Sequence, residues 1–393
     1  MNGMPYVKKI FYIQFSLDLI SGAFLVLSSW TIFATTGSLL LTGLYVSLGF
    51  VPSLIANLYI GAIVDRRDSK KMIQIAIIVI TIALFNMLIS FQLDSIYMLF
   101  LSHMLLQLGG SIFRPSVQVY MTQLFEHERL PYLFTKSASI SIFGGVIGSF
   151  IASQLVDYSN LSVLLLMLFS VAITFTISYT LPNTIQVKTK IHTTIHQDLK
   201  DGFRYIKTNS LFWKLFVILG SGQVITHCTT GFLAAFTYET FANNAAVYGY
   251  LQIILTVGGI SIGLCSKQFL TKLNRIFSHT AFLLLSLALI LCVFSKSHFI
   301  ISISLFLIGL LTTWIRSHFQ AVQQMHTAAG FNGKMASFRM IINQGSVVCI
   351  SPLLGVIASV IGTNYIFLLL AIISMASYLL IRNMYSINSE NSR

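Results

Sequence analysis

Charged side chains are scarce in this chain of 393 residues. Asp, Glu, Lys and Arg together make up 9% of it, whereas they supply about a quarter of a typical globular protein. Hydrophobic residues make up 55%, and the mean hydropathy is +0.82. This composition does not suit a water-soluble domain with a polar exterior. The sequence therefore predicts a protein of the lipid bilayer.

The motifs that mark enzymes and nucleotide-driven pumps are missing as well. The nearest approach to a phosphate-binding loop, AAGFNGKMAS at 328–337, lacks the leading Gly and the Ser or Thr that such a loop needs. HERLP at 127–131 fails the spacing of a zinc motif, and no nucleophile elbow is present. We therefore expect no enzyme and no cofactor, and an electrochemical gradient as the source of energy. The cysteines show no CxxC spacing and read as small core residues. They are Cys228, Cys265, Cys292 and Cys349.

Apolar runs recur along the chain at the length that spans a membrane. The hydrocarbon core of a bilayer is about 30 Å thick and needs roughly 20 residues of helix. Twelve runs approach this length, six in each half of the chain. They lie near 10–33, 43–64, 72–91, 96–123, 137–156, 161–181, 213–238, 246–265, 276–295, 299–325, 337–361 and 364–381. The sequence thus predicts an all-α integral membrane protein with twelve transmembrane helices.

The basic residues indicate how the helices are oriented. Cytoplasmic loops of membrane proteins carry an excess of Lys and Arg. With a cytoplasmic N-terminus, 21 of the 24 basic residues fall in inner segments; Lys296 is outside, and Arg114 and Arg316 lie within helices. Both termini are therefore predicted to be cytoplasmic. The net charge of +13 reports this topology, so we expect no nucleic-acid partner.

One cluster of charged residues lies between the second and third apolar runs. In GAIVDRRDSKKM, residues 61–72, six of the seven residues from Asp65 to Lys71 are charged. Lys70 and Lys71 need no role beyond that of a solvated inner anchor. Gly61 permits a close approach of helix backbones, and Asp65 can pair with a nearby Arg or a helix N-terminus.

The spacing Gly61-x-x-x-Asp65-Arg66-x-x-x-Lys70 resembles the signature loop of the major facilitator superfamily, G-x-x-x-D-R-x-G-R-K/R. The resemblance covers the whole chain. It implies two six-helix halves, 1–181 and 213–393, joined by a cytoplasmic linker at 182–212. In this family the loop is a latch that packs helix 2 against helix 11, so the resemblance makes the four residues a gating motif. Asp68 stands where the family prefers Gly.

Two further segments bear on the mode of transport. In the linker, apolar residues at 195, 199, 203 and 206 form one stripe, which predicts either an amphipathic helix on the inner membrane surface or a plain tether. In helix 5, Gly144 and Gly148 form a small-residue face for close packing. Drug antiporters of the family carry a Gly-Pro pair in helix 5, and this helix has no proline. The direction of transport, export or import, thus stays open at this point.

Ionisable residues inside spanning helices are functional candidates, because charge is costly within a bilayer. Apart from His279 near the inner end of the ninth run, they lie in the first, fourth, seventh and tenth runs, the helices that line the central cavity in the resembled family. Asp18, Arg114 and Arg316 each lie nine residues from the inner end of their helix, about 14 Å deep at 1.5 Å per residue. Polar residues on the same helical stripes complete the predicted binding set. The set is Gln14, His103, Gln107, Arg114, Gln118, Gln223, His227, Tyr238, Arg316 and Gln320.

Structural roles compete with functional ones at these positions. Asp18 and Arg114 can neutralise one another and hold helices 1 and 4 together, although one carboxylate cannot neutralise two arginines. His103 and His227 can be core residues. His318 is two residues from Arg316 and is expected to face away from the cavity.

We therefore hypothesise a proton-coupled exporter that acts as a monomer. Asp18 takes a proton when the substrate leaves and loses it when Arg114 approaches. Two arginines favour a small polar substrate with carboxylates, such as a siderophore or another metallophore. The loop and the stretch DLKDGFRYIKTNSLFWK also resemble bacterial exporters of the macrolide-efflux and siderophore-exporter group. The alternative is efflux of amphiphilic drugs or macrolides, and replacing Arg316 with Ala discriminates between the two.

Overall fold

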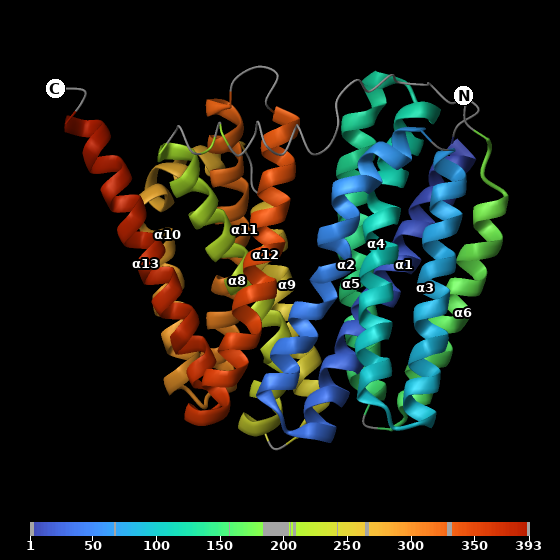
Figure 1. The fold of residues 1–393 in the computed structure, drawn as a ribbon, viewed down its shortest axis with the longest axis horizontal. Helices are drawn as coiled ribbons and strands as arrows, with labels where there is room; N and C mark the ends of the chain where they lie inside the picture. Colours follow the sequence, from blue (N-terminus) through green and yellow to red (C-terminus); the bar gives the residue numbers. More distant parts are fainter. Residues whose placement is uncertain are drawn as a thin grey trace. The chain divides into compact units, whose positions relative to one another are not determined.

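The computed structural model is helical in every regular element that it describes (Figure 1). It describes residues 4–66, 68–156, 158–183, 204, 206, 210–241, 243–263, 267–327 and 332–390. The helices are α1 (Met4–Thr36), α2 (Leu39–Arg66), α3 (Ser69–Gln92), α4 (Ile96–Leu124), α5 (Leu130–Leu155), α6 (Asn160–Tyr179), α8 (Ser210–Thr240), α9 (Ala245–Gly263), α10 (Lys267–Phe294), α11 (His298–His326), α12 (Asn332–Ile361) and α13 (Tyr365–Glu390). A short 3-10 helix, His127–Arg129, precedes α5. Most of the predicted linker at 182–212 lies outside the described residues.

The described helices match the predicted membrane spans closely. Eleven of them are long and apolar enough to cross a bilayer. In α10, the apolar part whose side chains are described, Thr280–Phe294, is shorter. Helices suit this solvent because each satisfies its own backbone hydrogen bonds, which lipid cannot do. The prediction of an all-helical membrane protein is confirmed, with eleven of the twelve predicted spans supported by length and composition.

The chain divides into two compact units. The first comprises Met1–Ile32, Leu48–His192 and Ala245–Gly249. Within it, α3 packs along α4 and against α6. The contact of α3 with α4 is close because Gly109 has no side chain; a Cβ there would lie 2.5 Å from Ile80 Cγ1. This unit contains Asp18 and Arg114.

The second unit comprises Phe33–Ser47, Thr193–Asn244 and Tyr250–Arg393. Its helix α8 packs against α11, α12 and α13, while α10 packs against α11 and α13. The first turns of α2 belong to this unit and meet α12 there: the Ser351 hydroxyl donates to the carbonyl oxygen of Gly43 at 3.0 Å. Arg316 lies in this unit.

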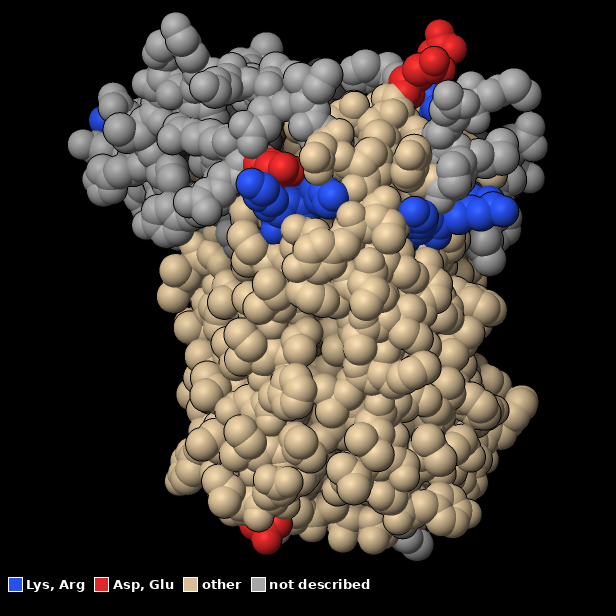
Figure 2. Space-filling model, turned by 90° about the vertical axis from the view of Figure 1, so that its right-hand side faces the viewer, with Lys and Arg blue, Asp and Glu red and all other residues tan. Residues whose placement is uncertain are grey.

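Charge is distributed unevenly over the face drawn in Figure 2. Lys and Arg side chains gather in a band on the upper part of this face, and a broad surface below them carries neither Lys nor Arg. Such a surface suits contact with acyl chains, and a band of basic residues suits one membrane interface.

Candidate functional site

The first candidate site lies where α1 and α5 cross at close range. A Cβ at Gly144 of α5 would lie 2.5 Å from the carbonyl oxygen of Phe15, and one at Gly148 would clash with the carbonyl of Leu19. Ordinary van der Waals contact for such a Cβ begins near 3.4 Å. Glycine therefore lets the two backbones touch, as expected for a small-residue helix face.

Asp18 lies beside this crossing, with neighbours from three helices. Its side chain is hydrogen-bonded to Ser141 of α5 and Gln14 of α1, and it interacts electrostatically with Arg114 of α4. The hydroxyl of Ser137, one turn before Ser141, donates to Gln14 Oε1 at 2.7 Å. The other carboxylate oxygen, Asp18 Oδ2, is buried and has no hydrogen-bond partner among the described residues. A buried oxygen left open in this way can accept a proton or the donor group of a ligand.

Arg114 lies on an open face of α4. Arg114 and Gln118 are exposed and Gln107 is half-buried. Between them, a Cβ at Gly110 would meet nothing within 4 Å. No described carboxylate lies within the 4.0 Å of an ion pair with Arg114, which leaves the guanidinium available to an anion. A guanidinium in a spanning helix is costly to expose to acyl chains, so this face borders a polar space.

His103 is placed in the core and away from this open face. Its side chain is 5% exposed, and its ring stacks on Phe24 of α1 with the centroids 6.0 Å apart. A Cβ at Gly49 of α2 would clash with the same ring. The four-residue spacing to Gln107 predicts a shared stripe, but α1 and α2 cover one end of that stripe.

The predicted binding residues of the second unit lie on two neighbouring helices. Arg316 is exposed on α11, and Gln320, one turn later, is half-buried. On α8, Gln223 and His227 are half-buried and also one turn apart. Helices α8 and α11 pack against each other. The second unit thus contains a cation and amide groups on adjacent helices, as the first unit does on α1 and α4.

Ring contacts hold two other polar residues of this unit. The ring of Tyr238 meets Phe33 edge-on, with centroids 5.5 Å apart. His318 stacks flat on Trp314, with centroids 4.6 Å apart, and lies edge-on to Phe319. Stacking on the residue one turn earlier fixes the imidazole against the body of α11.

A second polar cluster ties the end of α11 to the start of α12. Arg339 Nη1 donates to Gln323 Oε1 at 2.7 Å, and Gln323 Nε2 donates to Thr327 Oγ1 at 3.2 Å. Gln323 is 1% exposed and Arg339 is partly buried. A buried amide that accepts from a guanidinium forms a strong hydrogen bond, so this cluster joins the last turn of α11 to the first part of α12.

The charged loop after α2 is built around the start of α3. Asp68 is the N-cap residue of α3 and accepts from the backbone N–H of Lys70 at 2.9 Å and of Lys71 at 3.5 Å. The Lys70 ammonium group donates to the carbonyl oxygen of Tyr179 and to Asn183 Oδ1, both at 3.2 Å, at the end of α6. Asp68, which departs from the resembled pattern, thus has a capping role. The side chains of the other motif residues lie outside the described part of the chain: Gly61, Asp65 and Arg66.

Two residues of the first site were not predicted from the sequence, Ser137 and Ser141. Both lie on α5 and both contact α1 residues. A signal was present, because Ser137, Ser141, Gly144 and Gly148 follow one another at i, i+4, i+7 and i+11. The serines therefore extend the small-residue face of α5 to the depth of Asp18.

Comparison with known proteins agrees with this architecture. A sequence model of the family described as Major Facilitator Superfamily matches residues 10–346. No protein with a curated function matches the sequence.

Similar solved structures include three transporters. The nucleoside transporter NupG shows 14% identity over 98% of this chain and 99% of its own, with a TM-score of 0.78. A POT family transporter in complex with a thioalcohol-conjugated peptide shows 15% identity over 97% and 96%, with a TM-score of 0.76. A bacterial homologue of the iron transporter ferroportin, in an inward-facing state, shows 12% identity over 98% and 99%, with a TM-score of 0.74. At these identities the likeness concerns the fold.

Proposed function

This chain belongs to the major facilitator superfamily, and from that premise we propose that it is a proton-coupled exporter of a small polar molecule that bears carboxylates. The chain is a multi-pass membrane transporter and not an enzyme. The proposal places it in a bacterial cytoplasmic membrane as a monomer with both termini in the cytoplasm. Its two six-helix halves, 1–181 and 213–393, are joined by the linker at 182–212.

The proposal depends above all on one atom, Asp18 Oδ2. This oxygen is buried and has no hydrogen-bond partner among the described residues, while the rest of the carboxyl group is held by Ser141 and Gln14. A carboxyl group fixed on one side and open on the other can gain and lose a proton without moving its helix. Titratable residues inside transporters commonly serve as proton sites for this reason.

Exchange requires that the proton and the cargo compete for the same group. A hydroxyl or ammonium donor of the cargo binds the open oxygen of Asp18 more strongly while Asp18 is ionised, because a charged acceptor forms the stronger hydrogen bond. Protonation of Asp18 weakens that acceptor and favours release of the cargo. A proton driven by 100 mV supplies about 2.3 kcal/mol, enough for an accumulation of roughly 45-fold. The direction of exchange then follows the inward proton gradient, which means export of the cargo.

The arginines indicate a second chemical feature of the cargo, in addition to the donor group that binds Asp18. Arg114 is exposed on the open face of α4 within electrostatic reach of Asp18. A guanidinium group binds carboxylates in a two-pronged geometry, and a second arginine in the other unit, Arg316, suits a cargo with more than one carboxylate. A donor group combined with several carboxylates is the chemistry of a metal-chelating metabolite. We therefore favour a siderophore or another metallophore as the cargo.

The first test identifies the cargo. Culture media of the native organism with and without this gene, grown under metal starvation, are compared by untargeted mass spectrometry. We expect a carboxylate-rich chelator to be lost from the medium and retained in the cells of the deletion strain. Identical media together with greater sensitivity to lipophilic drugs would refute this proposal in favour of drug efflux.

The second test addresses proton coupling. Asp18→Asn keeps the hydrogen bonds to its neighbours possible but removes the titrating group, so export of the identified chelator should lose its dependence on external pH. Asp94→Asn is the matched control, because Asp94 is an exposed acid in a loop. Unchanged pH dependence in Asp18→Asn would exclude Asp18 as the proton site.

A further inference from the structure

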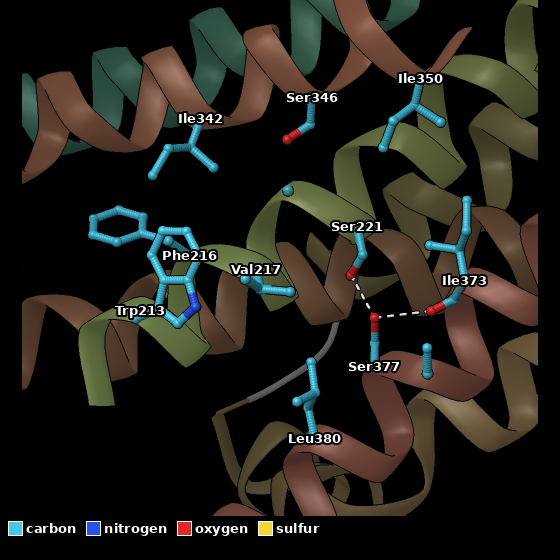
Figure 3. A pocket seen from close by; sticks show the side chains of 12 residues that line it. Trp213, Phe216, Val217, Ser221, Ile342, Ser346, Ile350, Ile373, Ser377 and Leu380 are labelled. Atoms are coloured by element: carbon cyan, nitrogen blue, oxygen red, sulfur yellow. Dashed lines mark hydrogen bonds between the residues drawn. The ribbon is translucent and has the colours of Figure 1, made fainter. Parts of the chain in front are cut away.

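A groove of about 370 Å³ lies between α12 and α13, with α8 as its floor (Figure 3). Helices α12 and α13 each pack on α8 and contact each other much less, which leaves this space between them. Hydrocarbon side chains form most of the walls. They include Trp213 and Phe216 of α8, Ile342 and Ile350 of α12, and Leu380 of α13.

Three serine hydroxyls line the groove, and two of them, those of Ser221 and Ser377, are already satisfied. Ser377 Oγ donates to Ser221 Oγ at 2.8 Å and lies 3.0 Å from the carbonyl oxygen of Ile373. Ser221 Oγ donates in turn to the carbonyl oxygen of Ile218 at 2.9 Å. Because these hydroxyls bond within and between their own helices, they do not call for a polar ligand. The occupant must therefore be largely apolar.

The length of the groove matches one leaflet of a bilayer. Its floor runs from Trp213 to Ser221 and its wall from Ile342 to Ile350, a rise of eight residues in each case, or about 12 Å at 1.5 Å per residue. One leaflet contributes about 15 Å of hydrocarbon.

Charge at one end of the groove indicates what the occupant carries there. This is the end at which α8 begins, which is the inner end in the proposed topology. Trp213 is 60% exposed in the first turn of α8, a position typical of an aromatic residue at the membrane interface. Lys214 follows it directly on α8. A basic residue at the cytoplasmic end of a groove between spanning helices suits an anionic lipid headgroup.

We propose that this groove binds an anionic phospholipid of the inner leaflet, with one acyl chain along α8 and its phosphate near Lys214. The acyl chain fills the space that α12 and α13 leave between them. Van der Waals packing, the main source of association inside a bilayer, would then join the two helices through the lipid. The basic end of the groove selects a lipid whose headgroup is negatively charged.

The experiment uses the full chain in nanodiscs of phosphatidylcholine with a small fraction of phosphatidylglycerol that carries a photoreactive diazirine in one acyl chain. Peptide mass mapping should locate the crosslinks on 213–221, 342–350 and 373–380. Ala376→Trp places a large ring in the groove and should reduce this labelling at least fivefold. Leu379→Trp adds the same ring next to the groove on an exposed position and should leave the labelling unchanged.

The headgroup is tested with a second pair of variants. Lys214→Gln should reduce labelling by photoreactive phosphatidylglycerol about fivefold, the equivalent of about 1 kcal/mol per basic residue near an anionic surface. Labelling by photoreactive phosphatidylcholine should not change. Lys296→Gln, in an exposed loop after α10, is the matched control. Equal labelling of all exposed helix faces, no effect of Ala376→Trp, or displacement of the lipid by the exported cargo would each overturn the proposal.

Discussion

Replacing Gly144 with Ala tests the backbone contact that positions Asp18. The added Cβ would lie 2.5 Å from the carbonyl oxygen of Phe15, which is 0.9 Å short of the 3.4 Å at which ordinary contact begins (3.4 − 2.5). Backbone atoms cannot rotate away as a side chain can, so α1 and α5 must separate by about that amount. Overpacking of this kind lowers the free energy of unfolding by about 1–3 kcal/mol.

The neighbouring residue supplies the control. A Cβ at Gly145 would lie 3.8 Å from the carbonyl oxygen of Asp18, which is ordinary van der Waals contact. Both substitutions gain the same helix propensity, about 1 kcal/mol, because both replace Gly with Ala inside α5. The difference between Gly144→Ala and Gly145→Ala therefore isolates the close contact, with an expected central value of about 2 kcal/mol.

Thermal unfolding of the two variants, purified side by side in one detergent at one scan rate, measures this difference. For a unit of this size about 2 kcal/mol corresponds to roughly 4–8 °C in apparent Tm. We expect Gly144→Ala to melt below Gly145→Ala by that amount and to lose more of its transport activity, because Asp18 lies on the separated face of α1. A Gly144→Ala variant that melts with or above Gly145→Ala would refute the close contact of α1 and α5.

Three other substitutions test the remaining contacts. Gln323→Leu leaves the guanidinium of Arg339 without its acceptor and should lower the free energy of unfolding by about 1.5–3 kcal/mol, measured by thermal melting, whereas Gln324→Leu on an exposed position should change little. Asp68→Ala removes the N-cap of α3 and should lower the free energy of unfolding by about 1 kcal/mol. Asp68→Asn can still cap the helix, so an equal loss of stability in that variant would contradict the capping role. Arg316→Ala should weaken binding of the identified chelator at least tenfold in equilibrium binding, and unchanged or tighter binding would indicate a cationic cargo.

The sequence by itself determined which segments cross the membrane. Lipid offers no hydrogen bonds, so an apolar run of about 20 residues forms a helix, in which the backbone groups bond to one another. The helical period likewise grouped Gln107, Arg114 and Gln118 on one stripe of α4, and the structure leaves that stripe open. The glycines of α5 also predicted a close helix contact, because few other residues allow two backbones to touch.

Tertiary structure decided which neighbour each stripe meets, because periodicity places residues on a face without naming the helix opposite. His103 shares a stripe with Gln107, yet α1 and α2 cover His103 and leave Gln107 half-buried. Only the crossing of α1 and α5 brought Ser141 to Asp18 while leaving Asp18 Oδ2 open. The groove over α8 also depends on packing alone, since it exists because α12 and α13 both pack on α8 and contact each other much less.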